Sequence, residues 1–344
     1  MVCYLGVERF RELVAQMGVS AIIRGVAASI EADFLRWGEF HKAPRYACHS
    51  SGGVIELMPT ADSERFACKY VNGHPANAKL GLQTVAAFGI LSDVATGYPI
   101  LIAEMTILTA LRTAATSALA AGRLARGDSH TMAIIGLGAQ SEFQAIAFRD
   151  LVGIQRLRVF DVDPAATAKF LANMSDERMI VEVASDAGEA ALGADIITTV
   201  TADKVKATIL SDNMIGRGVH INAVGGDCPG KTELSPKILE RADVFVELAE
   251  QTRIEGEIQQ MPAAFPVTEL WEVFSGSAPG RRSDDQITIF DSVGFAVEDF
   301  SALNYIYDLV RTDRDMPTLD LIAAPSDARD LFGLLAPRTS SVSA

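Results

Sequence analysis

The sequence has few of the residues that build metal sites and disulfide frameworks. Its four cysteines stand singly along 344 residues, no two form a Cys-x-x-Cys pair, and its five histidines show no metal-ligand spacing. These spacings argue against a zinc site, and we expect no metal ion. Scattered cysteines are typical of a reduced compartment, so the sequence predicts a cytoplasmic protein.

Long apolar runs are also lacking. No run approaches the roughly 20 apolar residues that cross a bilayer. The first apolar pattern contains charged residues that the core of a signal peptide would exclude, among them Glu8, Arg9 and Arg11. We therefore expect neither a membrane span nor a signal peptide.

Basic residues are fewer than acidic residues, 30 against 44, which gives a formal net charge of -14. An acidic surface repels phosphates, which argues against nucleic acid as a partner, and it weakly favours a cationic small molecule such as a diamino acid. Solubility alone is the simpler explanation of this charge.

The composition, with 49% apolar and 22% charged residues, is that of a folded globular chain. Its length suggests two domains. Helical spacing of apolar residues predicts helices over 7–17 and about 19–40, both packed as surface helices on a sheet. Short apolar runs between turn residues predict an antiparallel strand meander over 45–101, and a helix follows over 113–125.

Strands and helices alternate from about 131 to 294. Apolar strands are predicted at 133–135, 157–160, 180–183, 196–200, 219–224, 244–246 and 287–290. This alternation predicts an α/β fold with a parallel, doubly wound sheet of the Rossmann type, buried on both faces. A last helix over 297–311 precedes a polar tail. We expect the Rossmann domain, 126–299, to be inserted in an α+β domain made of 1–125 and 300–344.

A glycine turn begins the alternating region. The strand ending at Ile135 leads into Gly136-Leu137-Gly138-Ala139-Gln140-Ser141, and a helix pattern follows. Such a turn lets backbone N–H groups meet a pyrophosphate at a helix N-terminus. Asp161 ends the next strand, where a carboxylate accepts ribose hydroxyls and repels the extra phosphate of NADP, so NAD is the expected cofactor. Ser141 replaces the third glycine of the strict pattern.

Four further polar residues stand in apolar surroundings or at a strand end. Arg45, Lys69 and Arg112 lie in the meander or at its exit, and Asp227 follows a strand in a Gly-Gly turn. Each basic residue could instead be a stem packed on apolar surface, and Asp227 a simple turn residue. Glu56 is either a contact for an amine or an ordinary strand-face carboxylate.

Several segments together resemble the ornithine cyclodeaminase and mu-crystallin family. They are Phe66-Ala67-Cys68-Lys69-Tyr70-Val71-Asn72-Gly73-His74-Pro75, Leu111-Arg112-Thr113-Ala114-Ala115-Thr116, the glycine turn, Ala223-Val224-Gly225-Gly226-Asp227-Cys228-Pro229-Gly230-Lys231, Gln251-Thr252-Arg253-Ile254-Glu255-Gly256-Glu257 and Phe290-Asp291-Ser292-Val293-Gly294. The resemblance runs from about 45 to 302 and is strongest for bacterial ornithine cyclodeaminases.

The resemblance implies a role for each matching position. Arg45, Lys69 and Arg112 would hold the substrate α-carboxylate, and Asp227 would be the catalytic acid/base beside the side-chain amine. The residues that would line the NAD site, with Gly136 and Gly138 of the turn, are Thr84, Ala139, Gln140, Asp161, Thr201, Val224, Lys231 and Ser292.

The activity that the resemblance implies is conversion of L-ornithine into L-proline and ammonia, with hydride passed to and from NAD. A homodimer is expected by the same analogy. A ketimine reductase or amino-acid dehydrogenase, a lysine cyclodeaminase, and a non-catalytic binding protein of the mu-crystallin kind remain alternatives.

Overall fold

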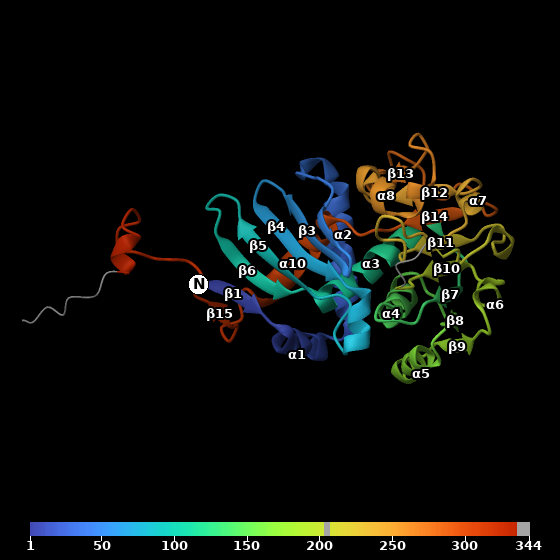
Figure 1. Cartoon of the computed structure of the whole chain (residues 1–344), viewed down its shortest axis with the longest axis horizontal. Coiled ribbons are helices and arrows are strands. Elements are labelled where there is room, and N and C mark those ends of the chain that lie inside the picture. The colour runs from blue at the N-terminus through green and yellow to red at the C-terminus, as the bar shows by residue number, and fades with distance from the viewer. Residues whose placement is uncertain (203–206, 336–344) are drawn as a thin grey trace, which may run out of the picture.

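The computed structural model describes residues 1–202 and 207–335, which form two sheets with helices packed between them (Figure 1). The first sheet contains the expected meander. Its strands are β2 (Tyr46–Ser50), β3 (Gly53–Ala61), β4 (Arg65–Gly73), β5 (Ala87–Asp93) and β6 (Pro99–Glu104). Each strand pairs antiparallel with the next, which confirms the prediction.

Two short strands extend this sheet beyond the meander. β1 (Val2–Leu5) pairs parallel with β6, and β15 (Thr318–Leu319) pairs antiparallel with β1, so that both ends of the chain join one sheet of order β15-β1-β6-β5-β4-β3-β2. The sequence analysis predicted neither strand, and it described the region of β15 only as a polar tail.

Helix α10 (Ala296–Val310) covers one face of the meander, over β3, β4 and β5, close to its expected bounds. Helix α1 (Val7–Met17) has the expected bounds. The prediction for the second helix was wrong in two respects. Helix α2 ends at Leu35 (Val19–Leu35) and a short 3-10 helix (Trp37–Glu39) follows, and α2 packs on other helices, mainly α3 and α10, because apolar residues occupy most of its circumference.

The second sheet is parallel throughout, with the order β13-β12-β14-β11-β10-β7-β8-β9. Its strands are β7 (Thr131–Ile135), β8 (Arg156–Phe160), β9 (Ile180–Val183), β10 (Ile196–Thr199), β11 (His220–Ala223), β12 (Asp243–Val246), β13 (Thr268–Glu269) and β14 (Thr288–Asp291). The outward order β7-β8-β9 on one side and β7-β10-β11-β14 on the other is that of a Rossmann sheet. Every predicted strand of this sheet is present, and only β13 was not predicted.

Both faces of the parallel sheet are buried. Met132 and Ile134 of β7 belong to one apolar cluster, and Ala133 and Ile135 belong to another on the opposite face. The helices that follow its strands are α4 (Ser141–Leu151), α5 (Pro164–Asn173), α6 (Ala187–Ala191), α7 (Pro236–Leu239), α8 (Ala249–Glu255) and α9 (Leu270–Phe274). The α/β class predicted from the alternation is therefore confirmed.

Helix α3 (Thr106–Leu124) connects the two sheets and begins earlier than predicted. It contacts β5 of the first sheet, β11 and β14 of the second, and helices α2 and α4 between them. Among the described residues, no single helix is long and apolar enough to cross a bilayer. Only α1 and α2 pass such a test together, as a pair bent by 99°.

Candidate active site

Two of the expected cationic residues meet at one carboxylate. Lys69 comes from the face of β4 that α10 covers, and its Nζ lies 2.8 and 2.9 Å from the two carboxylate oxygens of Asp299. Arg112 of α3 donates from Nε to the same carboxylate at 2.9 Å and from Nη1 to Glu298 at 2.6 Å. All four side chains are buried. Segments more than 180 residues apart in sequence thus converge on adjacent acids of α10.

Arg45 lies against the same group of residues. Its Nη1 donates to Glu56 of β3 at 3.1 Å, and its Nη2 donates to the carbonyl oxygens of Val293 and Gly294. Gly294 also adjoins Arg112, because a Cβ at position 294 would lie 2.6 Å from Nη1 of Arg112. The structure therefore brings together the three cations that the sequence analysis selected, with Glu56 beside them.

Burial dominates the electrostatics of this cluster. It lowers the pKa of Lys69 from 10.5 to about 8, although Asp299 opposes the shift. Burial raises the pKa of Glu298 to about 8, with Arg112 opposing, and it raises the pKa of Glu247, which accepts hydrogen bonds from Ser292 and the backbone of Gly294. Such perturbed groups gather where charge must be handled out of water.

The glycine turn lies between β7 and α4, as the sequence predicted. Gly136 has a φ of +100°, and a Cβ there would lie 2.8 Å from the backbone oxygen of Val200, so this position requires glycine. Gly138 is exposed and a Cβ there would meet no atom within 4 Å. Asp161, after β8, accepts backbone N–H donors from Leu137 and Asp163. The turn therefore leaves open space over a helix N-terminus beside a carboxylate, which fits a dinucleotide.

A side chain of the turn reaches toward the cationic cluster. Gln140 donates from Nε2 to the carbonyl oxygen of Ala110 on α3 at 3.0 Å, two residues before Arg112. The exposed Ala139 precedes it. This hydrogen bond fixes the turn relative to the helix that carries one of the cations.

Asp227 lies in the loop after β11, at the carboxyl edge of the parallel sheet. Its side chain is 55% exposed, and its Oδ1 lies 3.6 Å from Nζ of Lys231. The negative charge of Asp227 helps to raise the pKa of both Arg45 and Glu255, so Asp227 lies within electrostatic range of the cluster. Lys231 donates from Nζ to the carbonyl oxygen of Thr201 at 2.8 Å, and Thr201 donates to Glu233.

The remaining expected cofactor residues lie on loops at strand ends. Val224 directly follows β11 and Ser292 directly follows β14, adjacent strands of the parallel sheet. Thr84 lies in the loop between β4 and β5, where its carbonyl oxygen accepts a hydrogen bond from the backbone of His74. Carboxyl ends of parallel strands are the usual ligand edge of such a sheet.

Buried polar atoms without a hydrogen-bond partner gather at this edge. Among the described residues they include Glu298 Oε1 and Glu233 Oε2, while Arg45 Nε and Glu255 Oε2 form an ion pair at 3.1 Å without the alignment of a hydrogen bond. Such atoms are rare in folded proteins and mark positions where a ligand or water completes the bonding. The donor set, the open glycine turn and these atoms together suit a site for a nucleotide and a charged small molecule.

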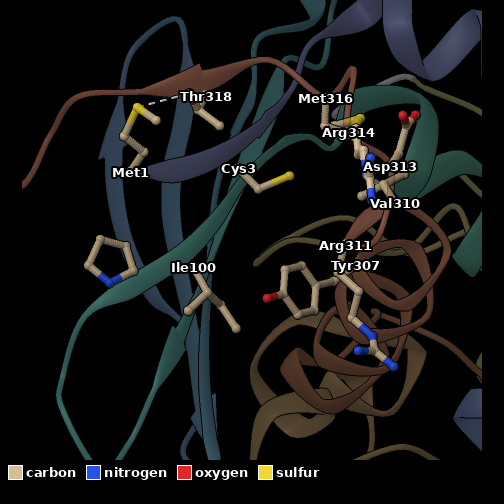
Figure 2. A pocket seen from close by; sticks show the side chains of 11 residues that line it. Met1, Cys3, Ile100, Tyr307, Val310, Arg311, Asp313, Arg314, Met316 and Thr318 are labelled. Atoms are coloured by element: carbon tan, nitrogen blue, oxygen red, sulfur yellow. Dashed lines mark hydrogen bonds between the residues drawn. The ribbon is translucent and has the colours of Figure 1, made fainter.

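The two hollows identified on the described surface lie elsewhere. One, of about 290 Å³, is lined by Cys3, Ile100 and Tyr307 among others, at the edge where β1 and β6 meet the end of α10 (Figure 2). The other, of about 310 Å³, adjoins Arg36 and Asp62. None of the residues expected at the site lines either hollow, so neither contributes to it.

The sequence analysis selected Glu56, which pairs with Arg45, but it missed the acids that partner Lys69 and Arg112. Glu298 and Asp299 are consecutive charged residues within the apolar pattern of α10, and that break in the pattern was the available signal. Glu247 and Glu255 lie after β12 and at the end of α8, and the second was quoted only as part of a motif.

Comparison with known proteins shows the family and supports the fold. The model of the ornithine cyclodeaminase/mu-crystallin family matches residues 8–314. The chain is 59% identical over 335 residues to an ornithine cyclodeaminase of Agrobacterium fabrum, covering 97% of this chain and 95% of that protein.

Two solved structures are similar over nearly the whole chain. One is a lysine cyclodeaminase described in terms of its recognition of L-lysine, L-ornithine and L-2,4-diaminobutyric acid, with a TM-score of 0.90 and 34% identity, covering 96% of this chain and 98% of that chain. The other is an archaeal alanine dehydrogenase dimer with bound NAD, with a TM-score of 0.85 and 30% identity, covering 93% and 99%.

Proposed function

The chain belongs to the ornithine cyclodeaminase/mu-crystallin family, and from that premise we propose that it is an NAD-dependent ornithine cyclodeaminase. It converts L-ornithine into L-proline and ammonia. The observation that carries the proposal is the convergence of Lys69 and Arg112 on Asp299, close to a glycine turn suited to a dinucleotide.

The cofactor is NAD, which the turn from Gly136 to Gln140 would hold, with the Asp161 carboxylate available to accept its ribose hydroxyls. When bound, NAD would supply reversible hydride transfer at Cα of ornithine, so that the reaction has no net redox change. Thr84, Thr201, Val224, Lys231 and Ser292 line the rest of the cofactor site.

The chain's own residues orient the amino acid. Nη2 of Arg112 donates to no acceptor among the described residues, so it is available to the substrate α-carboxylate, with Lys69 and Arg45 beside it. A guanidinium and an ammonium at fixed positions hold Cα in one place, which makes the hydride step effectively unimolecular.

Asp227 is the acid/base, and Glu56 receives the side-chain amine. Asp227 accepts a proton from the δ-ammonium. The freed amine then adds to Cα, which is an iminium carbon once its hydride has left, so the C=N π electrons pass to the α-nitrogen and a five-membered ring closes. Loss of the α-amino group as ammonia follows. The partly exposed position of Asp227 gives this proton a path to solvent.

The test is to incubate the purified protein with L-ornithine and a catalytic amount of NAD, and to quantify proline, ammonia and NADH together. Proline and ammonia in equal amounts without accumulation of NADH is the expected result. Stoichiometric NADH would contradict the proposal in favour of an amino-acid dehydrogenase, and binding of NAD without turnover would contradict it in favour of a binding protein. L-Lysine is the matched competitor, since one methylene changes binding by about 1 to 3 kcal/mol.

The active form is a homodimer. The face of the first sheet that points away from α10 carries a cross-strand row of Leu57, Tyr70 and Phe88, and Leu57 and Phe88 are exposed. Tyr70 and Phe88 stack with ring centroids 5.2 Å apart. An apolar sheet face of this kind favours burial against a second copy.

The presence of two separate sheets supports a division into two domains. We assign residues 1–125 and 300–344 to substrate binding and dimerisation, and 126–299 to NAD binding; positions 336–344 lie outside the described residues. We place the enzyme in the cytoplasm, in keeping with its scattered cysteines.

A further inference from the structure

Glu255, the last residue of α8, is a buried carboxylate that the reaction outlined above does not use. Its side chain is 5% exposed, and its Oε2 lies 3.1 Å from Nε of Arg45. The two atoms form an ion pair, although they are not aligned for a hydrogen bond. Arg45 thus serves two buried carboxylates, Glu255 and Glu56, so its single positive charge leaves one negative charge uncompensated, which favours a cationic ligand at this position.

The surroundings of Glu255 carry more negative than positive charge. The charged groups that face it are Arg45, Glu56 of β3, Asp227 after β11 and Glu247 after β12. Arg45 cannot neutralise them all, because its Nη1 already donates to Glu56 and its Nη2 to two backbone carbonyls. Burial raises the pKa of Glu255 to about 7, and the neighbouring acids add to the rise while Arg45 opposes it. With that pKa, the Glu255 carboxyl group is about half protonated at neutral pH in the free protein.

We propose that Glu255 is a third carboxylate of the substrate pocket, which receives the side-chain ammonium of a diamino acid beside Glu56 and Asp227 and releases a proton to solvent when that ammonium enters. The inference rests on the proposed function and adds to it a residue that selects the charge of the substrate. When the ammonium binds, the Glu255 carboxyl group loses one proton to solvent. The ammonium keeps its own protons, and an ion pair forms in the pocket.

Such a device distinguishes a diamino acid from a neutral one. The α-carboxylate of either amino acid can bind Lys69 and Arg112, but only a diamino acid brings a second cation for Glu255. An apolar side chain of equal length would bring no charge to favour the ionised form of Glu255, so the carboxyl group would keep the proton that it holds in the free protein.

The test measures proton release on binding by titration calorimetry in two buffers of different ionisation enthalpy. The protein is loaded with NADH, which cannot accept a hydride, so that ligands bind without reacting. L-Ornithine is compared with L-norvaline, which has the same carbon chain without the amine. The variant is Glu255→Gln, and the control is Glu250→Gln, an exposed glutamate on the same helix.

At pH 6.5 the wild type and E250Q should release between half and one proton per L-ornithine and none per L-norvaline. E255Q should lose that release and bind L-ornithine at least tenfold more weakly, with its NADH and L-norvaline affinities unchanged. Ornithine affinity and proton release equal to wild type in E255Q would overturn the inference. If E255Q does not fold, Glu255→Asp substitutes for it, with release retained and ornithine affinity reduced.

Failure of the proposed function would look different. A wild type that binds no L-ornithine, or yields no proline from it, contradicts the function itself. A wild type that makes proline while E255Q behaves identically contradicts only the role of Glu255.

Discussion

At the scale of single residues, Asp227 differs from the cations of the site in its exposure to solvent. The side chains of Arg45, Lys69 and Arg112 are buried and paired with acids, whereas more than half of the Asp227 side chain is exposed. An exposed carboxylate at the edge of a buried charge cluster exchanges protons readily, which suits an acid/base rather than a structural ion pair.

Replacing Asp227 by Asn should remove turnover and leave the cofactor in place. Asn keeps the size of the side chain but accepts no proton from the δ-ammonium, so kcat should fall by about 100-fold or more. Steady-state proline formation gives kcat, and fluorescence titration gives the affinity for NADH. Turnover close to wild type would remove Asp227 from its proposed role.

Lys69 should set an alkaline limit on substrate binding. Its pKa of about 8 means that it is charged below that pH and neutral above it. The KM for L-ornithine should therefore rise as pH increases through 8, by about tenfold per unit beyond it, if the charged form alone holds the carboxylate. Lys69→Arg stays charged and should remove that rise.

The comparison of wild type with K69R from pH 6.5 to 9.5 cancels the titration of the substrate itself, which both proteins share. Parallel KM profiles in the two proteins would show that the charge of Lys69 does not limit binding.

At the scale of elements, the glycine turn contains two glycines with opposite requirements. Gly136 has a positive φ and backbone atoms where a Cβ would lie, while Gly138 has open space. Gly136→Ala should therefore destabilise the fold by about 1 to 3 kcal/mol. Gly138→Val should preserve stability and weaken NAD binding at least tenfold, because its side chain would fill the space that the pyrophosphate needs.

Thermal unfolding without cofactor, together with NAD titration, separates these two effects. Each variant is the control for the other. If both variants bound NAD as tightly as the wild type, the dinucleotide would not bind at this turn.

Local pattern was sufficient to predict most elements, and distance in sequence explains what was missed. β7 to β12 and β14 coincide with short apolar runs, and these runs are sufficient to predict a strand. β13 and β15 have only two residues each, and they are strands only because they pair with a neighbouring strand. β1 was missed because its partner β6 lies about 100 residues away. The packing of α2 was misjudged because a helix with apolar residues on most of its circumference does not indicate which neighbouring element it contacts.

The site shows the same division. Motifs pointed to the cations and the glycine turn, but charge pairing cannot be read from local sequence. The partners of Lys69 and Arg112 lie on α10, so the acidic half of the cluster became visible only in the folded chain.

At the scale of the whole molecule, the proposed dimer interface is the sheet face that carries Leu57, Tyr70 and Phe88. Leu57→Asp would place a charge within that apolar row, and its desolvation would oppose association. Light scattering should give twice the mass of one chain for the wild type and a shift toward one chain for the variant.

Leu192→Asp, at an exposed position after α6, is the matched control and should leave the mass unchanged. An unaltered assembly in L57D, with the control also unaltered, would exclude this face as the interface.

The hydrogen bond from Gln140 to Ala110 has a consequence for how such chains can diversify. Since each residue advances an α-helix by about 100°, one insertion in α3 between Ala110 and Arg112 would swing the guanidinium off its acids while the turn stayed anchored. The helical phase of this short stretch is thus locked. New preferences among amino acids must arise by exchanging side chains around the pocket, because changes in length there would uncouple the nucleotide from the amino acid.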